Sequence, residues 1–189
     1  MTIVHDAPAR VLQMGEPGLR RISAPVADIA DPAFVADGRR LTATLQAFRE
    51  AHGFGRAIAA PQIGVAQRFI AVHLAGEPSF RGLLINPVIR WRSEQTFTMW
   101  DDCMSFPSIL VRLRRHHSIS LSFHDEQGEA RTWTQLDRAT SELLQHEMDH
   151  LDGILAVDHA IDRDAIVMRE AFEAMPDHFR RQVDYVIGG

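Results

Sequence analysis

Cysteine is almost absent from this sequence of 189 residues, and Cys103 is the single example. One cysteine excludes an internal disulfide, which is typical of proteins from a reducing compartment such as the cytoplasm. No apolar run approaches the ~18 residues that cross a membrane, and the first residues lack the basic and apolar regions of a signal peptide. We therefore expect a cytoplasmic protein that does not enter the membrane.

An excess of positive charge is also missing. The chain has 20 Lys and Arg residues against 25 Asp and Glu residues, which gives a net charge of -5. Proteins that bind nucleic acid usually carry a basic patch, so this balance argues against direct recognition of nucleic acid. Hydrophobic residues make up 46% of the chain and charged residues 24%, as in ordinary globular proteins. We expect one domain, residues 1–189, with a sizeable core.

The spacing of apolar residues predicts an α+β fold. A capping Asp and a following Gly bound an expected helix at residues 32–52. A second helix is expected at 137–153, and a C-terminal one at 162–174 that Pro176 would stop. Short strands joined by tight turns favour antiparallel sheet between the first two helices. These strands are expected at 69–74, 83–89, 94–100, 111–115, 118–123 and 130–134.

The Gly-rich stretch 53–64 precedes these strands, and its small residues allow another backbone to come close. No Lys-Ser/Thr pair follows it, which excludes the usual phosphate-binding loop. A segment that pairs by its backbone with an extended peptide fits the composition better. An ordinary tight loop is the alternative.

The helix expected at 137–153 contains His146-Glu147-Met148-Asp149-His150. Histidines four residues apart lie on one face of a helix, about one turn from each other. They can bind one metal ion, and the glutamate between them can reach a water on that metal. The pattern fixes only three positions, so a polar helix face with two solvated histidines is the alternative.

Cys103 is the candidate for a third metal ligand. A lone cysteine is usually a small buried hydrophobe. Together with His146 and His150 it would give three protein ligands and leave a fourth position for water, as in catalytic sites. A thiolate with two imidazoles suits Zn(II) or Fe(II) better than Mg(II) or Ca(II).

Three separated segments resemble the motifs of the peptide deformylases, the metal amidases that remove the N-formyl group from the initiator methionine of nascent polypeptides. Residues 55–62 resemble a Gly-x-Gly-apolar-Ala-Ala-x-Gln motif, and residues 101–105 resemble Glu-Gly-Cys-Leu-Ser. Residues 145–153 match the third motif closely, and the resemblance extends over about residues 10–160. It implies antiparallel sheets packed around a central metal-binding helix, with an N-terminal and a C-terminal helix.

The resemblance implies a role for each matching residue. Glu147 would take a proton from the attacking water and pass it to the leaving amine. The Gln62 amide and the backbone N–H of Met104 would stabilise the oxyanion. In the family the metal is commonly Fe(II), with Zn(II) often found after oxidation or purification. The implied metal ligands are Cys103, His146 and His150.

The resemblance also implies how substrate binds. The substrate peptide would pair as an added strand with the chain's own backbone, and Leu143 would line an apolar pocket for the methionine side chain. Nascent formyl-methionyl chains are the implied substrate, the ribosome is a candidate partner, and monomer and dimer both stay open. The pairing residues are Gly55, Arg56, Ala57 and Ile58.

Arg115 is expected to support the Cys103 loop. Alternation along the strand at 111–115 places it on the same side as Val111 and Leu113. If that side faces the core, the arginine needs a carboxylate, and Asp101 beside Cys103 is the nearest candidate. A solvated surface arginine is the alternative.

Three residues depart from the family motifs. Asp101 replaces Glu, Asp102 replaces Gly, and Ala57 replaces the second Gly of the first motif. These changes bear on substrate affinity and choice and leave the ligands, base and oxyanion donor intact. Two other functions therefore stay open: a metal amidase for another N-acyl substrate, and a metal-containing binding protein without turnover.

Overall fold

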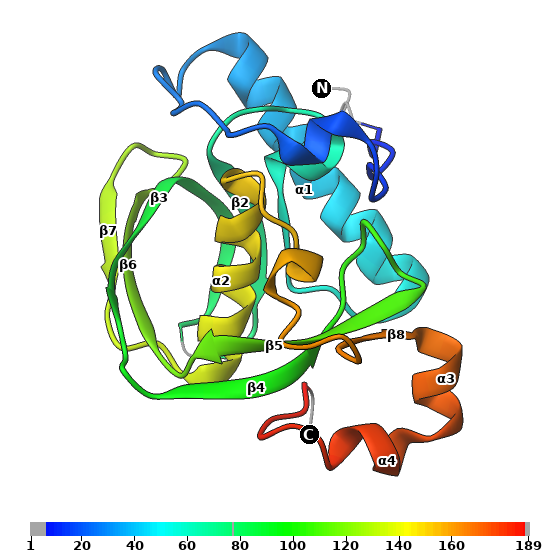
Figure 1. Cartoon of the computed structure of the whole chain (residues 1–189). Coiled ribbons are helices and arrows are strands. Elements are labelled where there is room, and N and C mark those ends of the chain that lie inside the picture. Colours follow the sequence, from blue (N-terminus) through cyan, green and yellow to red (C-terminus); the bar gives the residue numbers. More distant parts are fainter. Residues whose placement is uncertain (1–6, 77, 188–189) are drawn as a thin grey trace.

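Two antiparallel β-sheets frame the protein, and helix α2 (Arg138–Leu151) contacts strands of both (Figure 1). The structure is a computed structural model and describes residues 7–76 and 78–187. The first sheet has the order β1 (Ala57–Ala59), β2 (Phe69–Leu74), β3 (Phe80–Arg92), β6 (Ile119–His124) and β7 (Ala130–Trp133). The second has the order β4 (Thr96–Asp101), β5 (Ile109–His116) and β8 (Ile166–Met168).

The five-stranded sheet is covered by a helix on each face. On β2, Ile70 and Val72 belong to the apolar cluster that includes α2, whereas Phe69 and Ala71 belong to the cluster that includes α1 (Pro32–His52). Strand side chains alternate between the two faces of a sheet, so a strand with apolar residues at every position can only be buried between two layers. This arrangement places α2 inside the molecule, and its polar residues are buried with it.

Local signals determine where α2 begins and ends. Asp137 precedes the helix, and its side chain accepts a hydrogen bond from the Thr140 N–H at 3.0 Å, which caps the N-terminus. Gly153 follows the C-terminus with φ of 71°, and its N–H donates to the His150 carbonyl. Glycine adopts this left-handed conformation without a steric penalty. The helix that carries His146 and His150 therefore has well-defined ends.

The α+β class, the six strands and the first two helices are confirmed, with boundaries that shift by a few residues. The hairpin turn before β7 is also present, with the Gly128 N–H donating to the Asp125 carbonyl. Among the described residues no helix is long and apolar enough to cross a bilayer. Three short 3-10 helices complete the fold: Pro17–Arg20, Ala60–Ile63 and Ala156–His159.

The C-terminal helix expected at 162–174 is wrong in its first half, whereas its end at residue 174 is confirmed. Residues 166–168 instead form β8, because Ile166 and Val167 pair with β5 and favour extended backbone. Helix α3 (Arg169–Ala174) follows, and α4 (Pro176–Arg180) begins at the proline that was expected to stop the helix. Proline suits a first helical position, where its missing N–H would have no partner.

The segment after α4 returns to the open edge of β4, where Figure 1 shows the red end of the chain. The N–H groups of Asp184 and Tyr185 both donate to the Thr98 carbonyl at 3.1 Å. The Asp184 carboxylate in turn accepts the Thr98 N–H at 2.9 Å. Residues beyond β8 therefore contribute to the wall of the second sheet.

We expect Gly153→Ala to lower the free energy of unfolding by about 1–3 kcal/mol. The added Cβ would lie 2.6 Å from the Arg20 carbonyl oxygen, at a backbone conformation that alanine rarely adopts. Urea unfolding of the metal-loaded protein measures the change. Gly76→Ala is the matched control, because its Cβ would meet no heavy atom within 4 Å. Equal losses in the two variants would contradict this account.

Candidate metal centre

Three buried side chains from two elements meet at one point. His146 and His150 come from neighbouring turns of α2, and Cys103 lies just after the end of β4. The Cys103 sulfur and one nitrogen of each histidine lie within 4.8 Å of one another. The Sγ of Cys103 is 3.3 Å from the Nε2 of His150. The structure thus brings together all three ligands that the sequence predicts.

The donor set fits a tetrahedral metal ion. Bonds of about 2.0–2.3 Å to nitrogen and sulfur separate neighbouring ligand atoms by roughly 3.5 Å, close to the spacing here. The Nδ1 of His146 lies 2.9 Å from the carboxylate of Asp101, so this nitrogen donates and Nε2 is left for a metal. Three protein ligands leave a fourth position, which is the arrangement of a catalytic site.

The Asp101 carboxylate and the Cys103 sulfur favour a positive charge at His146, and a bound metal ion would supply that charge in place of the proton. Burial would raise the pKa of Asp101, but His146 and Arg115 outweigh it and hold that pKa far below its usual value. Burial would lower the pKa of His146, but Asp101 and Cys103 raise it well above 6.5. Burial and the charge of His146 lower the pKa of His150 to about 3, so its imidazole is neutral and can act as a ligand.

Arg115 is buried and contacts Asp101, as the alternation along its strand predicts. Its Nη2 lies 3.1 Å from the Asp101 carboxylate, and its Nη1 pairs with Asp149. The Nε2 of His159 lies 3.0 Å from the same Asp149 carboxylate. The sequence analysis missed Asp149 and His159, because nothing in the sequence distinguishes His159 from the other scattered histidines. The network links the Cys103 side of the centre to α2.

Glu147 and Gln62 lie beside the three ligands. Glu147 is buried, its Oε2 has no hydrogen-bond partner among the described residues, and burial is the main cause that raises its pKa to about 7. The Gln62 amide nitrogen lies 3.3 Å from the Ser105 hydroxyl and 3.6 Å from the Cys103 sulfur. Its oxygen accepts the Ala59 N–H at 2.9 Å, which fixes the direction of the amide.

Strand β1 is the edge of the five-stranded sheet and has a free side. The His73 N–H of β2 donates to the Arg56 carbonyl at 2.7 Å, so Arg56 and, two residues on, Ile58 face β2. The N–H and C=O of Ala57 therefore point away from β2, toward the free side. Gly55 precedes the strand with φ of 122°, and its carbonyl already accepts a hydrogen bond from Arg49. Among the expected pairing residues, Ala57 is therefore the one whose N–H and C=O are both placed to bond to an added strand.

The comparison with known proteins decides between the open functions. A family model described as polypeptide deformylase matches residues 8–165. The chain belongs to this family. A peptide deformylase from Thermotoga neapolitana is 30% identical over 161 residues, which cover 85% of this chain and 92% of the relative. One from a Synechococcus species is 37% identical over 147 residues, 71% of each chain.

A solved structure supports the same assignment. The peptide deformylase of Legionella pneumophila has a TM-score of 0.74 and 26% identity, covering 93% of this chain and 97% of that one. Peptide deformylases are metal-dependent hydrolases that remove the N-formyl group from the N-terminal methionine of new polypeptides. Membership in the family confirms the fold, the hydrolase class and the function expected from the three motifs.

The structure shows the surroundings of Asp102, which departs from the family motif, and of Leu143, the expected lining of the methionine pocket. Asp102, which replaces a motif glycine, accepts a hydrogen bond from the Nη2 of Arg169 at 2.8 Å, so its charge is balanced. Leu143, the expected lining of the methionine pocket, belongs to the apolar cluster between α2 and the five-stranded sheet. Immediately before it on α2, Glu142 is buried and forms an ion pair with Arg56. No sequence pattern links these two residues.

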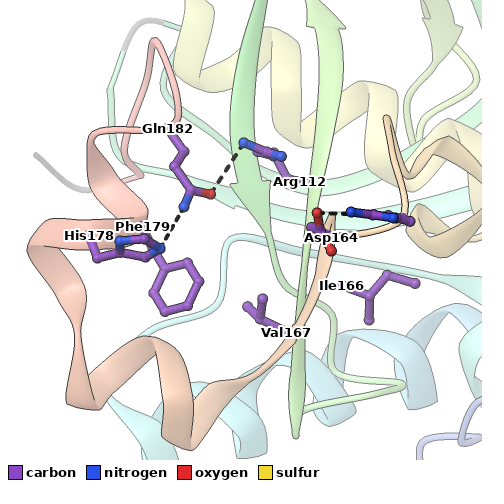
Figure 2. A pocket seen from close by; sticks show the side chains of 8 residues that line it. Arg112, Asp164, Ile166, Val167, His178, Phe179 and Gln182 are labelled. Atoms are coloured by element: carbon purple, nitrogen blue, oxygen red, sulfur yellow. Dashed lines mark hydrogen bonds and ion pairs between the residues drawn. The ribbon is translucent and has the colours of Figure 1, made fainter.

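Two cavities flank the second sheet. The larger, about 600 Å³, lies between β5, β8 and α4, and Figure 2 shows Arg112 and Gln182 bonded across it at 3.2 Å. The smaller, about 380 Å³, is bounded by Phe54, Asp102 and Tyr185 among others. Asp102 lines this cavity, whereas Cys103, His146 and His150 do not.

We expect Arg115→Met to lower the free energy of unfolding by about 3–5 kcal/mol, since it leaves the buried Asp101 and the largely buried Asp149 without their cation. The metal content after dialysis should fall as well, because the carboxylate that orients His146 is no longer braced. Urea unfolding and elemental analysis measure the two effects.

The control is Arg114→Met, the exposed neighbour whose side chain donates to Thr96 at 3.2 Å. This variant should stay within about 0.5 kcal/mol of the wild type. Full metal occupancy and unchanged stability of Arg115→Met would remove the bracing role of the arginine.

Proposed function

We propose that residues 1–189 act as one catalytic domain that deformylates N-formyl-methionyl peptides, with Cys103, His146 and His150 as the metal ligands. One observation carries the assignment of these residues. Three buried ligand atoms meet within 4.8 Å, and beside them lies Glu147, a buried carboxylate whose Oε2 has no partner among the described residues. A purely structural metal site has no need of that carboxylate.

A divalent ion held there would polarise the formyl carbonyl and make a water molecule nucleophilic near neutral pH. We propose Fe(II) as the native ion, with Zn(II) as the alternative. The support is the donor set, because one thiolate and two imidazoles suit these ions better than hard cations.

Glu147 is the general base in this proposal. Its Oε2 accepts a proton from the attacking water and then donates it to the amine that leaves. A catalytic group works best when its pKa is near the working pH, and burial brings the pKa of this carboxyl to about 7. The lack of a competing hydrogen bond leaves the oxygen available for both transfers.

Gln62 and Met104 stabilise the negative charge that develops on the formyl oxygen. The Gln62 amide nitrogen is aimed at the centre, 3.6 Å from the Cys103 sulfur. Its direction is fixed because its oxygen is held by the Ala59 N–H. The backbone N–H of Met104 adjoins the same ligand. Donors held in advance toward such a charge contribute about 10²–10³ in turnover each.

The substrate peptide pairs with the free side of β1. The N–H and C=O of Ala57 point that way. Backbone pairing of this kind accepts many sequences beyond the first residue, which suits an enzyme for all new polypeptides. We place the protein in the cytoplasm, where formylated chains leave the ribosome.

The first test is formate release from a formyl-Met tripeptide under anaerobic conditions with Fe(II) supplied. We expect turnover by the wild type and a loss of about 10²–10⁴ in kcat for Glu147→Ala, because its proton transfer is removed. A chelator should abolish activity, and added Fe(II) should restore it.

Glu173→Ala is the control and should keep full activity, since this glutamate is exposed on α3. Metal bound at one ion per chain without formate release by the wild type would contradict the proposal. So would a Glu147→Ala variant as active as the wild type.

A further inference from the structure

Arg56 and Glu142 form an ion pair at the helix that carries His146 and His150. Neither residue has a role in the proposed chemical step. Glu142 is on α2 four residues before His146 and is 2% exposed. Its carboxylate forms an ion pair with Arg56, the residue just before β1. The Nη1 of Arg56 also donates to the Ala139 carbonyl at 2.8 Å, so the guanidinium is held against the first turn of α2.

The pair joins α2, which carries two of the metal ligands, to the residue just before β1. Residues four apart share a helix face and are separated by about 5.4 Å along the axis, so Glu142 is one turn from His146. Arg56 adjoins Ala57, whose backbone points to the free side of the strand.

A formylated peptide would place its first side chain in this region. The α-carbon of the first residue is only about 2.5 Å from the formyl carbon. Its side chain therefore begins near the metal and extends by about one helical turn. Glu142 and Leu143 both lie within one turn of His146. Leu143 packs in the apolar cluster with Ala57, whereas Glu142 presents a carboxylate that pairs with Arg56.

We propose that the Arg56–Glu142 ion pair lines the position of the substrate's first side chain and favours side chains that carry a hydrogen-bond acceptor. Among side chains derived from methionine, the sulfoxide is the one with a strong acceptor oxygen. The proposal rests on the proposed deformylase function and specifies its preference at the first residue: among formylated peptides, those whose first side chain ends in an acceptor oxygen, such as oxidised methionine, are turned over faster than their apolar counterparts.

The physical basis is the unused hydrogen-bonding capacity of Arg56. Its guanidinium has five N–H groups, of which Nη1 and Nη2 make the bonds to Ala139 and Glu142. One third of its side chain is exposed, so water can reach the guanidinium donors that these two bonds leave free. An apolar side chain would displace that water without replacing its hydrogen bonds, whereas an acceptor oxygen would replace them.

The experiment compares kcat/KM for formyl tripeptides that differ only in the first residue: norleucine, methionine, methionine sulfoxide and glutamine. We expect the wild-type enzyme, loaded with Fe(II), to favour the sulfoxide over norleucine by about tenfold, since one partly exposed donor group is involved. A wild-type preference for norleucine of similar size would overturn the proposal without any variant.

The variant is Arg56→Met with Glu142→Leu, which removes both charges together and leaves no unpaired buried charge. It should reverse the preference, with the sulfoxide-to-norleucine ratio falling by about 10- to 100-fold. Arg112→Met with Asp162→Leu is the matched control, because this ion pair joins β5 to the loop before β8 and touches none of the ligands. The sulfoxide-to-norleucine ratio of kcat/KM in this control should equal that of the wild type.

Two further results separate the possible failures. If the double variant folds, binds metal and keeps the wild-type ratio, the pair only ties β1 to α2 and the proposal is wrong. Arg56→Met with Glu142→Gln gives the same comparison with a polar residue kept on α2, should the first variant be unstable. If no formylated peptide is turned over by the wild type, the deformylase function fails first, and this inference falls with it.

Discussion

One buried carboxylate holds the metal centre together. Asp101 ends β4 and accepts hydrogen bonds from Arg115 of β5 at 3.1 Å and from His146 of α2 at 2.9 Å. A buried carboxylate is costly unless its charge is compensated, so the position of Asp101 is determined by these two partners. Cys103 follows two residues later, and its sulfur is thereby brought to the helix that supplies the other ligands.

The sequence predicted most of this centre because its parts are local. The spacing of His146 and His150 needs only a helix, and capping residues define that helix before any tertiary contact is known. Arg115 could be placed by alternation along one strand. The Arg56–Glu142 pair could not, because 86 residues separate its members and each reads as an ordinary surface charge. Resemblance to the family predicted an apolar pocket lined by Leu143 and gave no role to its neighbour Glu142.

The helix expected at 162–174 was wrong in its first half, because pairing with another strand determines the conformation there. Residues 166–168 are extended because β5 offers them an unpaired edge, and no property of the segment itself reveals that edge. The family match ends at residue 165, yet the segment beyond it contacts the centre, since Arg169 pairs with Asp102. The charge that replaces a motif glycine is thus balanced from outside the matched region.

The pairing of the last described residues with β4 has a consequence for assembly. An exposed strand edge is a template on which another chain can add, and proteins commonly cover such edges. Here Asp184 and Tyr185 use the N–H and C=O of Thr98. This part of the β4 edge is closed to foreign strands, while the free side of β1 remains available. In the proposed binding mode, a newly made chain pairs with the free side of β1 and meets a β4 edge that the protein's own C-terminal segment already occupies at Thr98.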